Sequence, residues 1–236
     1  MRRYARWHIW LGWLVGVPLL LWTFSGVAMV LRPIEEVRGN DLRLEQPRQV
    51  MTRNAMPIAF QPNGLPGAIE LRSFIQRGRA VTLVTASDGN VRRYDAATGR
   101  PIPPVGEQEA RAAVAAAVRG GRQIESLTLF SAEDVPLDFR KPVAAWRAVL
   151  ANGANVYVNR DTGEVDAVRT RWWRFYDIMW GIHIMDLQTR EDAHNPFIIG
   201  FGILAFIGGL FGVVLLFRRR KARAAAVTAA VSGPGR

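Results

Sequence analysis

Residues 9–31 read IWLGWLVGVPLLLWTFSGVAMVL, an apolar run without a charged side chain. At about 1.5 Å per residue, a helix of this length crosses the hydrocarbon core of a bilayer, which is about 30 Å thick. Residues 197–217 form a second such run, FIIGFGILAFIGGLFGVVLLF. Asn195 and Pro196 precede it and suit the cap and the first position of a helix. The sequence therefore predicts two transmembrane helices, at residues 9–31 and 197–217.

The first run also has to be compared with a cleaved secretory leader, because Arg2 and Arg3 precede it. The apolar region of a leader is about 7–15 residues long and ends in a small-x-small cleavage site. This run is longer and ends in Val30, Leu31 and Arg32. We therefore expect an anchor that is not cleaved.

The formal charge of +11 is concentrated beside the two apolar runs. Nine cations and no acid lie in these flanks: Arg2, Arg3, Arg6, Arg218, Arg219, Arg220, Lys221, Arg223 and Arg236. Residues 32–195 hold the other 22 Lys and Arg and all 20 Asp and Glu, so their net charge is only +2. Basic flanks predict that both termini are cytoplasmic and that the middle is translocated, in a bacterium to the periplasm. A nearly neutral middle excludes a nucleic-acid-binding domain.

The segment between the spans carries the pattern of one α+β domain. Strands are predicted at residues 68–74, 80–85, 91–94, 126–131, 143–150, 156–159 and 165–169. Residues 107–118, EQEARAAVAAAV, have high helix propensity and acids in the first turn. We therefore expect an antiparallel sheet packed on a helix.

In chain order the sequence predicts seven segments. They are a basic cytoplasmic N-terminus (1–8), a transmembrane helix (9–31), a periplasmic tether (32–67), a periplasmic domain (68–171), an interfacial aromatic helix and turn (172–196), a second transmembrane helix (197–217) and a basic cytoplasmic tail (218–236). Residues 222–236 are rich in small residues and are expected to fray.

Two short patterns leave alternatives open. Asn90-Val91 leads to Ala97-Thr98-Gly99, and Asn155-Val156 leads to Asp161-Thr162-Gly163, with one residue's difference in spacing. This is either an internal duplication or two unrelated hairpins that each need a glycine.

Small residues four apart also occur in both spans, as Gly12 with Gly16 and Gly208 with Gly212. Such pairs let helix backbones approach closely. They serve either a dimer or the packing of the two spans within one chain, and we favour the second.

Three stretches together resemble a known family. EQEARAAVAAAV, followed by WRAVLANGANVYVNRDTGEVDAV at residues 146–168, is similar to the PepSY domain. WHIWLGWLVGVPLLLWTFSGVAMVLRP (7–33) and WWRFYDIMWGIHIMDLQTREDAHNPF (172–197) resemble the membrane segments of PepSY-associated transmembrane proteins. The resemblance implies a bacterial inner-membrane protein with a periplasmic PepSY domain. Larger relatives with four spans are linked to ferric-siderophore reduction and carry haem, and this chain has only two spans.

The histidines are the candidate cofactor ligands, because the chain has no cysteine for thiolate sites or covalent haem. A haem b needs two axial ligands. His8 lies at the other end of a span from His183 and His194 and cannot share a haem with them in one chain. Either His183 pairs with His194, or like histidines meet across a dimer axis.

Residues 172–187 place His183 on an aromatic helix face, which equally suits a membrane interface. Asp177 and Asp186 are expected to orient His183. Glu133, Asp134 and Asp138 form an acidic loop that is a weak candidate for a cation.

Two functions remain open from the sequence, and a third, inhibition or chaperoning of a periplasmic protease, is implied only by the resemblance to the PepSY domain. The first is an accessory subunit without catalysis of its own, which binds another inner-membrane or periplasmic protein of a redox or iron-acquisition system. The second is a haem b oxidoreductase subunit that passes electrons to a ferric or flavin acceptor. Both place the chain in the lipid bilayer, and a homodimer is compatible with either.

Overall fold

The structure is a computed structural model that describes residues 2–45 and 67–231. The chain divides into two compact units. One contains the residues up to Leu31 together with those from Phe175 onward, and the other contains Arg32–Arg174. The predicted tail residues 232–236, Arg236 included, lie outside the described residues.

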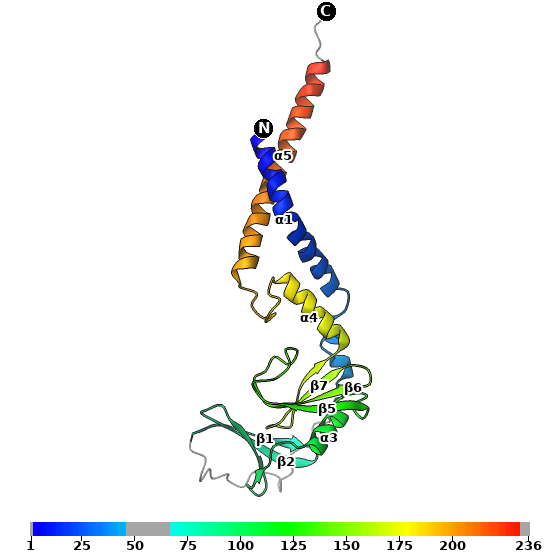
Figure 1. Ribbon diagram of the computed structural model, residues 1–236, viewed down its shortest axis with the longest axis vertical. Helices are drawn as coiled ribbons and strands as arrows, with labels where there is room; N and C mark the ends of the chain where they lie inside the picture. The colour runs from blue at the N-terminus through cyan, green and yellow to red at the C-terminus, as the bar shows by residue number, and fades with distance from the viewer. Residues whose placement is uncertain (1, 46–66, 232–236) are drawn as a thin grey trace, which may run out of the picture. The chain divides into compact units, whose positions relative to one another are not determined.

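The first unit is built on two long helices, α1 (Arg2–Met29) and α5 (Pro196–Val231) (Figure 1). Arg3–Met29 and Pro196–Ala222 are long and apolar enough to cross a membrane. α1 ends two residues before the predicted boundary at Leu31. α5 continues well beyond residue 217, because the alanine-rich stretch that was expected to fray is a strong helix former.

Two glycines of α5, Gly208 and Gly212, face α1. A Cβ added at Gly212 would lie 3.2 Å from His8 Cε1, and one at Gly208 would lie 4.0 Å from Leu11 Cβ. Gly12 and Gly16 on α1 have no heavy atom of the described residues within 4 Å of such a Cβ. The α5 pair therefore serves packing within the chain, as favoured, while the α1 pair does not.

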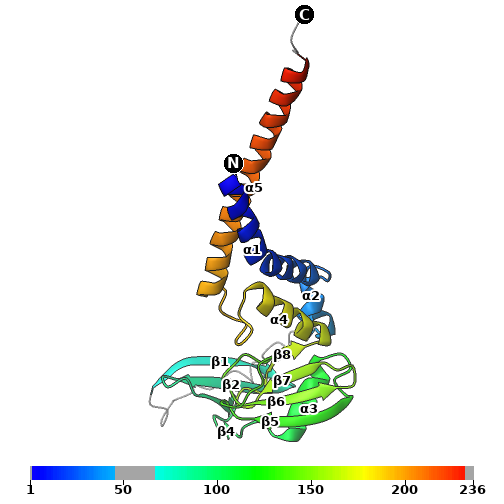
Figure 2. The ribbon, with the colours of Figure 1, turned by 45° about the horizontal axis from the view of Figure 1, so that its top comes forward.

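The second unit contains two four-stranded antiparallel sheets where the sequence predicts one (Figure 2). The first sheet consists of β1 (Ala68–Gln76), β2 (Arg79–Ala86), β3 (Val91–Asp95) and β4 (Pro101–Ile102). The second consists of β5 (Ile124–Phe130), β6 (Ala145–Leu150), β7 (Asn155–Asn159) and β8 (Val165–Arg169). Each sheet follows chain order. The α+β class with two candidate spans is confirmed.

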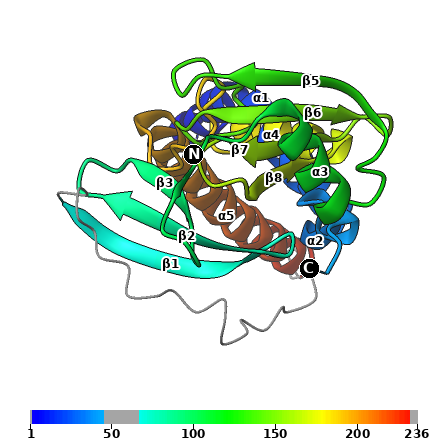
Figure 3. The same ribbon diagram turned by 90° about the horizontal axis from the view of Figure 1, so that it is seen from below.

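The core lies on both faces of the second sheet. Helix α3 (Glu107–Ala117) packs on one face through Ala110, Ala113 and Val114 (Figure 3). The loop between β5 and β6 covers the other face, where the Phe139 ring stacks on that of Tyr157 with centroids 4.6 Å apart. Both aromatic side chains are fully buried.

The described part of the predicted tether is folded. Ile34–Val37 forms a short helix, α2, and Asn40–Leu42 forms a 3₁₀ turn, η1. Val37 is buried, Leu42 packs against the core of the second sheet, and Arg43 bridges to Val118 after α3. The rest of the predicted tether, residues 46–66, lies outside the described residues.

The two turns singled out in the sequence make the same hydrogen bonds. Asp95 Oδ1 accepts from the N–H groups of Ala97 and Thr98, and Asn159 Oδ1 accepts from those of Asp161 and Thr162. Gly99 N donates to Asp95 O at 2.8 Å, and Gly163 N donates to Asn159 O at 2.9 Å. Both glycines have a positive φ, 67° and 71°.

This correspondence holds at a constant offset of 64 positions, from 95 to 159 and from 99 to 163. The preceding hairpins obey it too, because Ala86 N donates to Asn90 O and Leu150 N donates to Ala154 O. Asn90 therefore corresponds to Ala154 and not to Asn155, and this accounts for the one-residue difference in spacing between the two sequence patterns. We call residues 79–102 the first repeat and residues 143–166 the second repeat. The pattern favours duplication over two unrelated hairpins.

Candidate functional site

His183 ends helix α4 (Arg171–His183) and contacts α1 within the first unit. Its ring stacks on Trp22, with centroids 4.7 Å apart and an interplanar angle of 18°. His183 Nδ1 lies 3.1 Å from the Trp22 carbonyl oxygen and 3.1 Å from Ser25 Oγ. Ser25 is fully buried, and its hydroxyl donates to the same carbonyl at 2.9 Å.

A glycine makes room for this imidazole. A Cβ added at Gly26 would lie 3.2 Å from His183 Cε1, tighter than an ordinary contact. The sequence Trp22-Thr-Phe-Ser25-Gly26 therefore supplies a stacking surface, a hydrogen-bonding hydroxyl and a gap within about one helical turn. The spacing patterns of the sequence do not indicate these α1 residues as partners of His183. A serine beside a glycine in an apolar span is the signal that could have found them.

The contact with the Trp22 carbonyl favours a proton on Nδ1 of His183. A carbonyl oxygen only accepts, so the proton belongs on Nδ1, which donates toward Trp22 O. Nε2 has no hydrogen-bond partner in the described parts of the chain. A neutral imidazole held at Nδ1 by a backbone carbonyl is the form in which histidine binds metals and haem iron through Nε2.

The two carboxylates expected to orient His183 act elsewhere. Asp177 is buried on α4 and pairs with Arg190, with Nη1 and Oδ2 2.8 Å apart. Asp186 organises the loop after α4, accepting from the backbone N–H groups of residues 188, 189, 191 and 192 and from the Thr189 hydroxyl. The Thr189 hydrogen bond is the main reason that the pKa of Asp186 is lowered. Ser25 and the Trp22 carbonyl orient His183 instead.

The other two histidines are not brought to this place. His194 is exposed, and within the described chain the only hydrogen bond at this residue is its backbone N–H to Asp192 Oδ1. His8 packs against Gly212 of α5, with its Nδ1 buried and without a hydrogen-bond partner among the described residues. His8 lies 17 residues before Ser25 on α1, a rise of about 26 Å. No contact in the described chain joins His183 to His194.

The acidic loop residues do not converge on a cation site. Asp138 accepts from the Tyr157 hydroxyl at 2.6 Å and from the Asn155 amide at 3.0 Å, and Asp134 accepts from Ser131. Burial and the Asp138 carboxylate raise the pKa of Tyr157. Across residues 2–45 and 67–231 no three His, Cys, Asp or Glu side chains group as metal ligands. Asp138 is a structural partner of the second sheet.

One of the comparisons with known proteins gives a match. A family model described as the PepSY-associated TM region covers residues 5–236. No curated protein and no solved structure matches the chain.

Proposed function

Because the chain belongs to the family of PepSY-associated transmembrane proteins, we propose that it is an inner-membrane accessory subunit. In this proposal two helices anchor the chain, and the unit of residues 32–174 faces the periplasm, where it binds another protein of a redox or iron-acquisition system. Both termini are cytoplasmic.

The observation that carries the proposal is the division of the chain. One compact folded unit, Arg32–Arg174, is inserted between two helices that are each long enough to span a bilayer. The arginines that flank these helices lie at the chain ends, where the positive-inside rule favours the cytoplasm. A domain inserted between two such anchors is held on the other side of the membrane.

Reporter fusions test this orientation. A phosphatase that is active only outside the cytoplasm should be active when fused at Asn152 and inactive when fused after Arg223. The same two fusions to a reporter that fluoresces only in the cytoplasm should give the reverse result. Activity of the phosphatase after Arg223 would contradict the proposed topology.

A second function, haem b electron transfer, is favoured by one observation: Nε2 of His183 makes no hydrogen bond within the described residues. His183 would hold the haem iron through this atom, and the residues around it suit that role, since Trp22 O and Ser25 hold Nδ1. A bound haem would supply one-electron transfer. The described contacts provide no second histidine from the same chain, so the second ligand would come from His183 of another copy across a two-fold axis.

Two measurements separate these functions. A haem protein purified in detergent should show a Soret band that is lost in His183→Ala and kept in His194→Ala, and a colourless, folded preparation contradicts the haem function. In a deletion strain given a ferric siderophore as its only iron source, growth should be slowed. His183→Ala restores growth if the chain is an accessory subunit and fails if it carries haem. Unimpaired growth of the deletion strain contradicts the link to iron.

A further inference from the structure

Strand β3 contains Val91, whose backbone edge no strand covers in the part of the chain that the structure describes. Ala86 N donates to Asn90 O and Ala96 N donates to Ala80 O, so the even-numbered residues of β3 direct their backbone groups toward β2. The odd-numbered residues therefore face the opposite edge, where Asp95 N donates to Arg100 O and Arg93 pairs with Ile102. Val91 faces the same edge, and β4 pairs only with Arg93 and Tyr94.

The second repeat shows what covers the equivalent edge. Val91 and Arg92 correspond to Asn155 and Val156 of β7 at the offset of 64. Those two residues pair with Arg169 and Val168 of β8. In the second repeat, then, an antiparallel strand lies along the edge that the first repeat leaves open.

The residues that follow β4 explain why this strand ends at Ile102. The residues after Ile102 are Pro103 and Pro104, which have no N–H to donate to a neighbouring strand. The chain then leaves β3: the Pro103 carbonyl accepts from Arg93 Nη2 at 2.7 Å, and Val105 N donates to Arg160 O at 2.7 Å. The departing segment opens a cavity of about 570 Å³.

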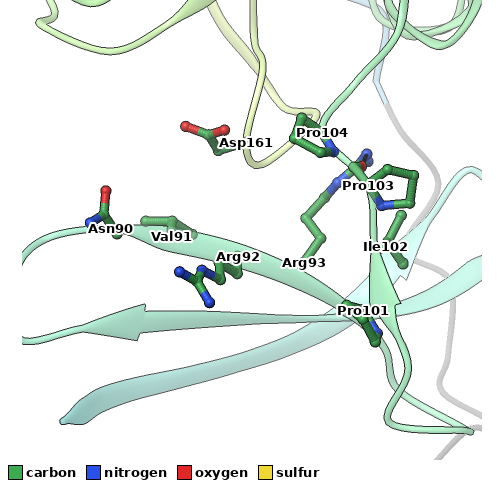
Figure 4. Close-up of a pocket in the computed structure, with 9 residues that line it drawn as sticks. All are labelled: Asn90, Val91, Arg92, Arg93, Pro101, Ile102, Pro103, Pro104 and Asp161. Atoms are coloured by element: carbon green, nitrogen blue, oxygen red, sulfur yellow. Dashed lines mark hydrogen bonds between the residues drawn. The ribbon is translucent and has the colours of Figure 1, made fainter. Parts of the chain in front are cut away.

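The cavity lies between β3, the proline segment and the turn of the second repeat. Figure 4 shows Arg93 extending from β3 toward Pro103 and Pro104, with Asp161 across from Asn90 and Val91. Arg92 also lines the cavity and is exposed. Neither the Arg92 guanidinium nor the Asp161 carboxylate has a hydrogen bond or ion pair within the described residues. Within the described residues, the site therefore offers an uncovered strand edge and side chains of both charges that make no hydrogen bond.

We propose that this cavity binds an extended segment of a partner protein, which adds to β3 as β8 adds to β7. The guest strand exchanges backbone hydrogen bonds with Val91 and places an acidic side chain beside Arg92. Backbone pairing supplies general affinity, and the charges at Arg92 and Asp161 select the side chains. The inference deepens the proposed accessory function, because it names the surface that receives the partner.

Peptide selection with the full-length protein in lipid nanodiscs tests this site. Random ten-residue peptides displayed on phage are selected against the protein and counter-selected against empty nanodiscs. Enriched peptides are synthesised with fluorescein, and their affinities are measured by fluorescence anisotropy. We expect Asp or Glu at one fixed position. Arg92→Glu should weaken binding about tenfold or more, whereas the matched exposed variant Arg100→Glu should bind within about twofold of wild type.

Hydrogen exchange supplies the readout specific to strand addition. Bound peptide should slow exchange across residues 90–93 and leave the covered residues 155–158 unchanged. Failure to enrich any peptide, equal effects of the two Arg-to-Glu variants, or unchanged exchange at residues 90–93 would each overturn the proposal. These outcomes are independent of the topology test. If the phosphatase fused at Asn152 were inactive while the peptide still bound, only the periplasmic accessory function would be contradicted, and the peptide site would stand.

Discussion

The first and second repeats make the same turn hydrogen bonds and differ in most of their side chains. These hydrogen bonds depend on a side-chain acceptor, Asp95 or Asn159, and on a glycine with positive φ four residues later. Outside these positions the sequences diverge: exposed Arg92 corresponds to Val156, which is fully buried in the core. A few turn residues therefore specify the hairpin, and the remaining positions adapt to their surroundings.

The comparison is sharpest where both repeats bury a polar group. Arg93 and Tyr157 occupy equivalent positions, and both are buried. Arg93 pairs with Glu109 of α3, and Tyr157 donates to Asp138 of the β5–β6 loop. Each repeat is therefore anchored to a carboxylate outside it, with an ion pair in one case and a neutral donor in the other.

The largest effect is expected from removing the charged anchor. Arg93→Met deprives Glu109 of its main partner and leaves the Pro103 carbonyl without its donor. Loss of one member of a buried ion pair costs about 3–5 kcal/mol. Glu109 keeps Arg77 and is one-third exposed, so we expect about 3 kcal/mol. Tyr157→Phe should cost about 1–2 kcal/mol.

Hydrogen exchange of the slowest amides in β2 and β6 of the full-length protein measures both opening free energies. Equal costs for Arg93→Met and Tyr157→Phe would contradict the distinction between an ionic and a neutral anchor.

The next effect concerns the two turn glycines. Gly99→Ala should lower the free energy of unfolding by about 1 kcal/mol, the cost of a positive φ in alanine. No steric cost is added, because no heavy atom of the described chain lies within 4 Å of the added Cβ. At Gly163 the Cβ would also lie 2.9 Å from Arg93 Nη1 and 3.2 Å from Gln76 Oε1. We expect Gly163→Ala to cost about 2–3 kcal/mol in the same exchange measurement. A smaller cost for Gly163→Ala than for Gly99→Ala would show that Arg93 moves aside freely.

The third effect is a pH dependence of the ion pair that anchors the first repeat to α3. The hydrogen bond from Arg93 lowers the pKa of Glu109 below its ordinary value of 4.5. A depressed carboxyl pKa contributes stability that is present above pH 4.5 and is lost as the pH falls through the lower, folded-state pKa. The destabilisation caused by Glu109→Gln should therefore shrink below about pH 4.5. The matched exposed variant Glu125→Gln should follow wild type throughout, and a constant Glu109→Gln effect down to pH 2 would contradict this prediction.

The local parts of this fold could be predicted from the sequence. Strands β2, β3 and β8 and helix α3 lie within one or two residues of their expected bounds, because alternating burial and glycine turns are local signals. Strand β4 has only two residues and was missed. The separation into two sheets was also missed, since strand patterns do not state which strands pair.

The candidate site shows the same limit. The placement of His183 on an aromatic helix follows from local spacing, but its partner Ser25 lies 158 positions away in the chain. The expected partners Asp177 and Asp186 are the nearest carboxylates in sequence. In the structure, Asp177 pairs with Arg190, and Asp186 accepts hydrogen bonds from the loop after α4. The periodicity of one segment cannot indicate which distant helix that segment contacts.

The smallest effect comes from making the two turns alike. Asp95→Asn gives the first repeat the residue that the second has at position 159, where the amide oxygen accepts the same two backbone N–H groups. The change removes the charge that pairs with Arg79, whose side chain is 60% exposed, and such pairs contribute about 0–1 kcal/mol. We expect Asp95→Asn to cost less than about 0.5 kcal/mol, and Asp95→Ala, which loses the acceptor, about 1–2 kcal/mol. Hydrogen exchange of β3 separates the two variants. Equal costs for both would mean that the carboxylate charge, which the second repeat lacks, holds the first turn together.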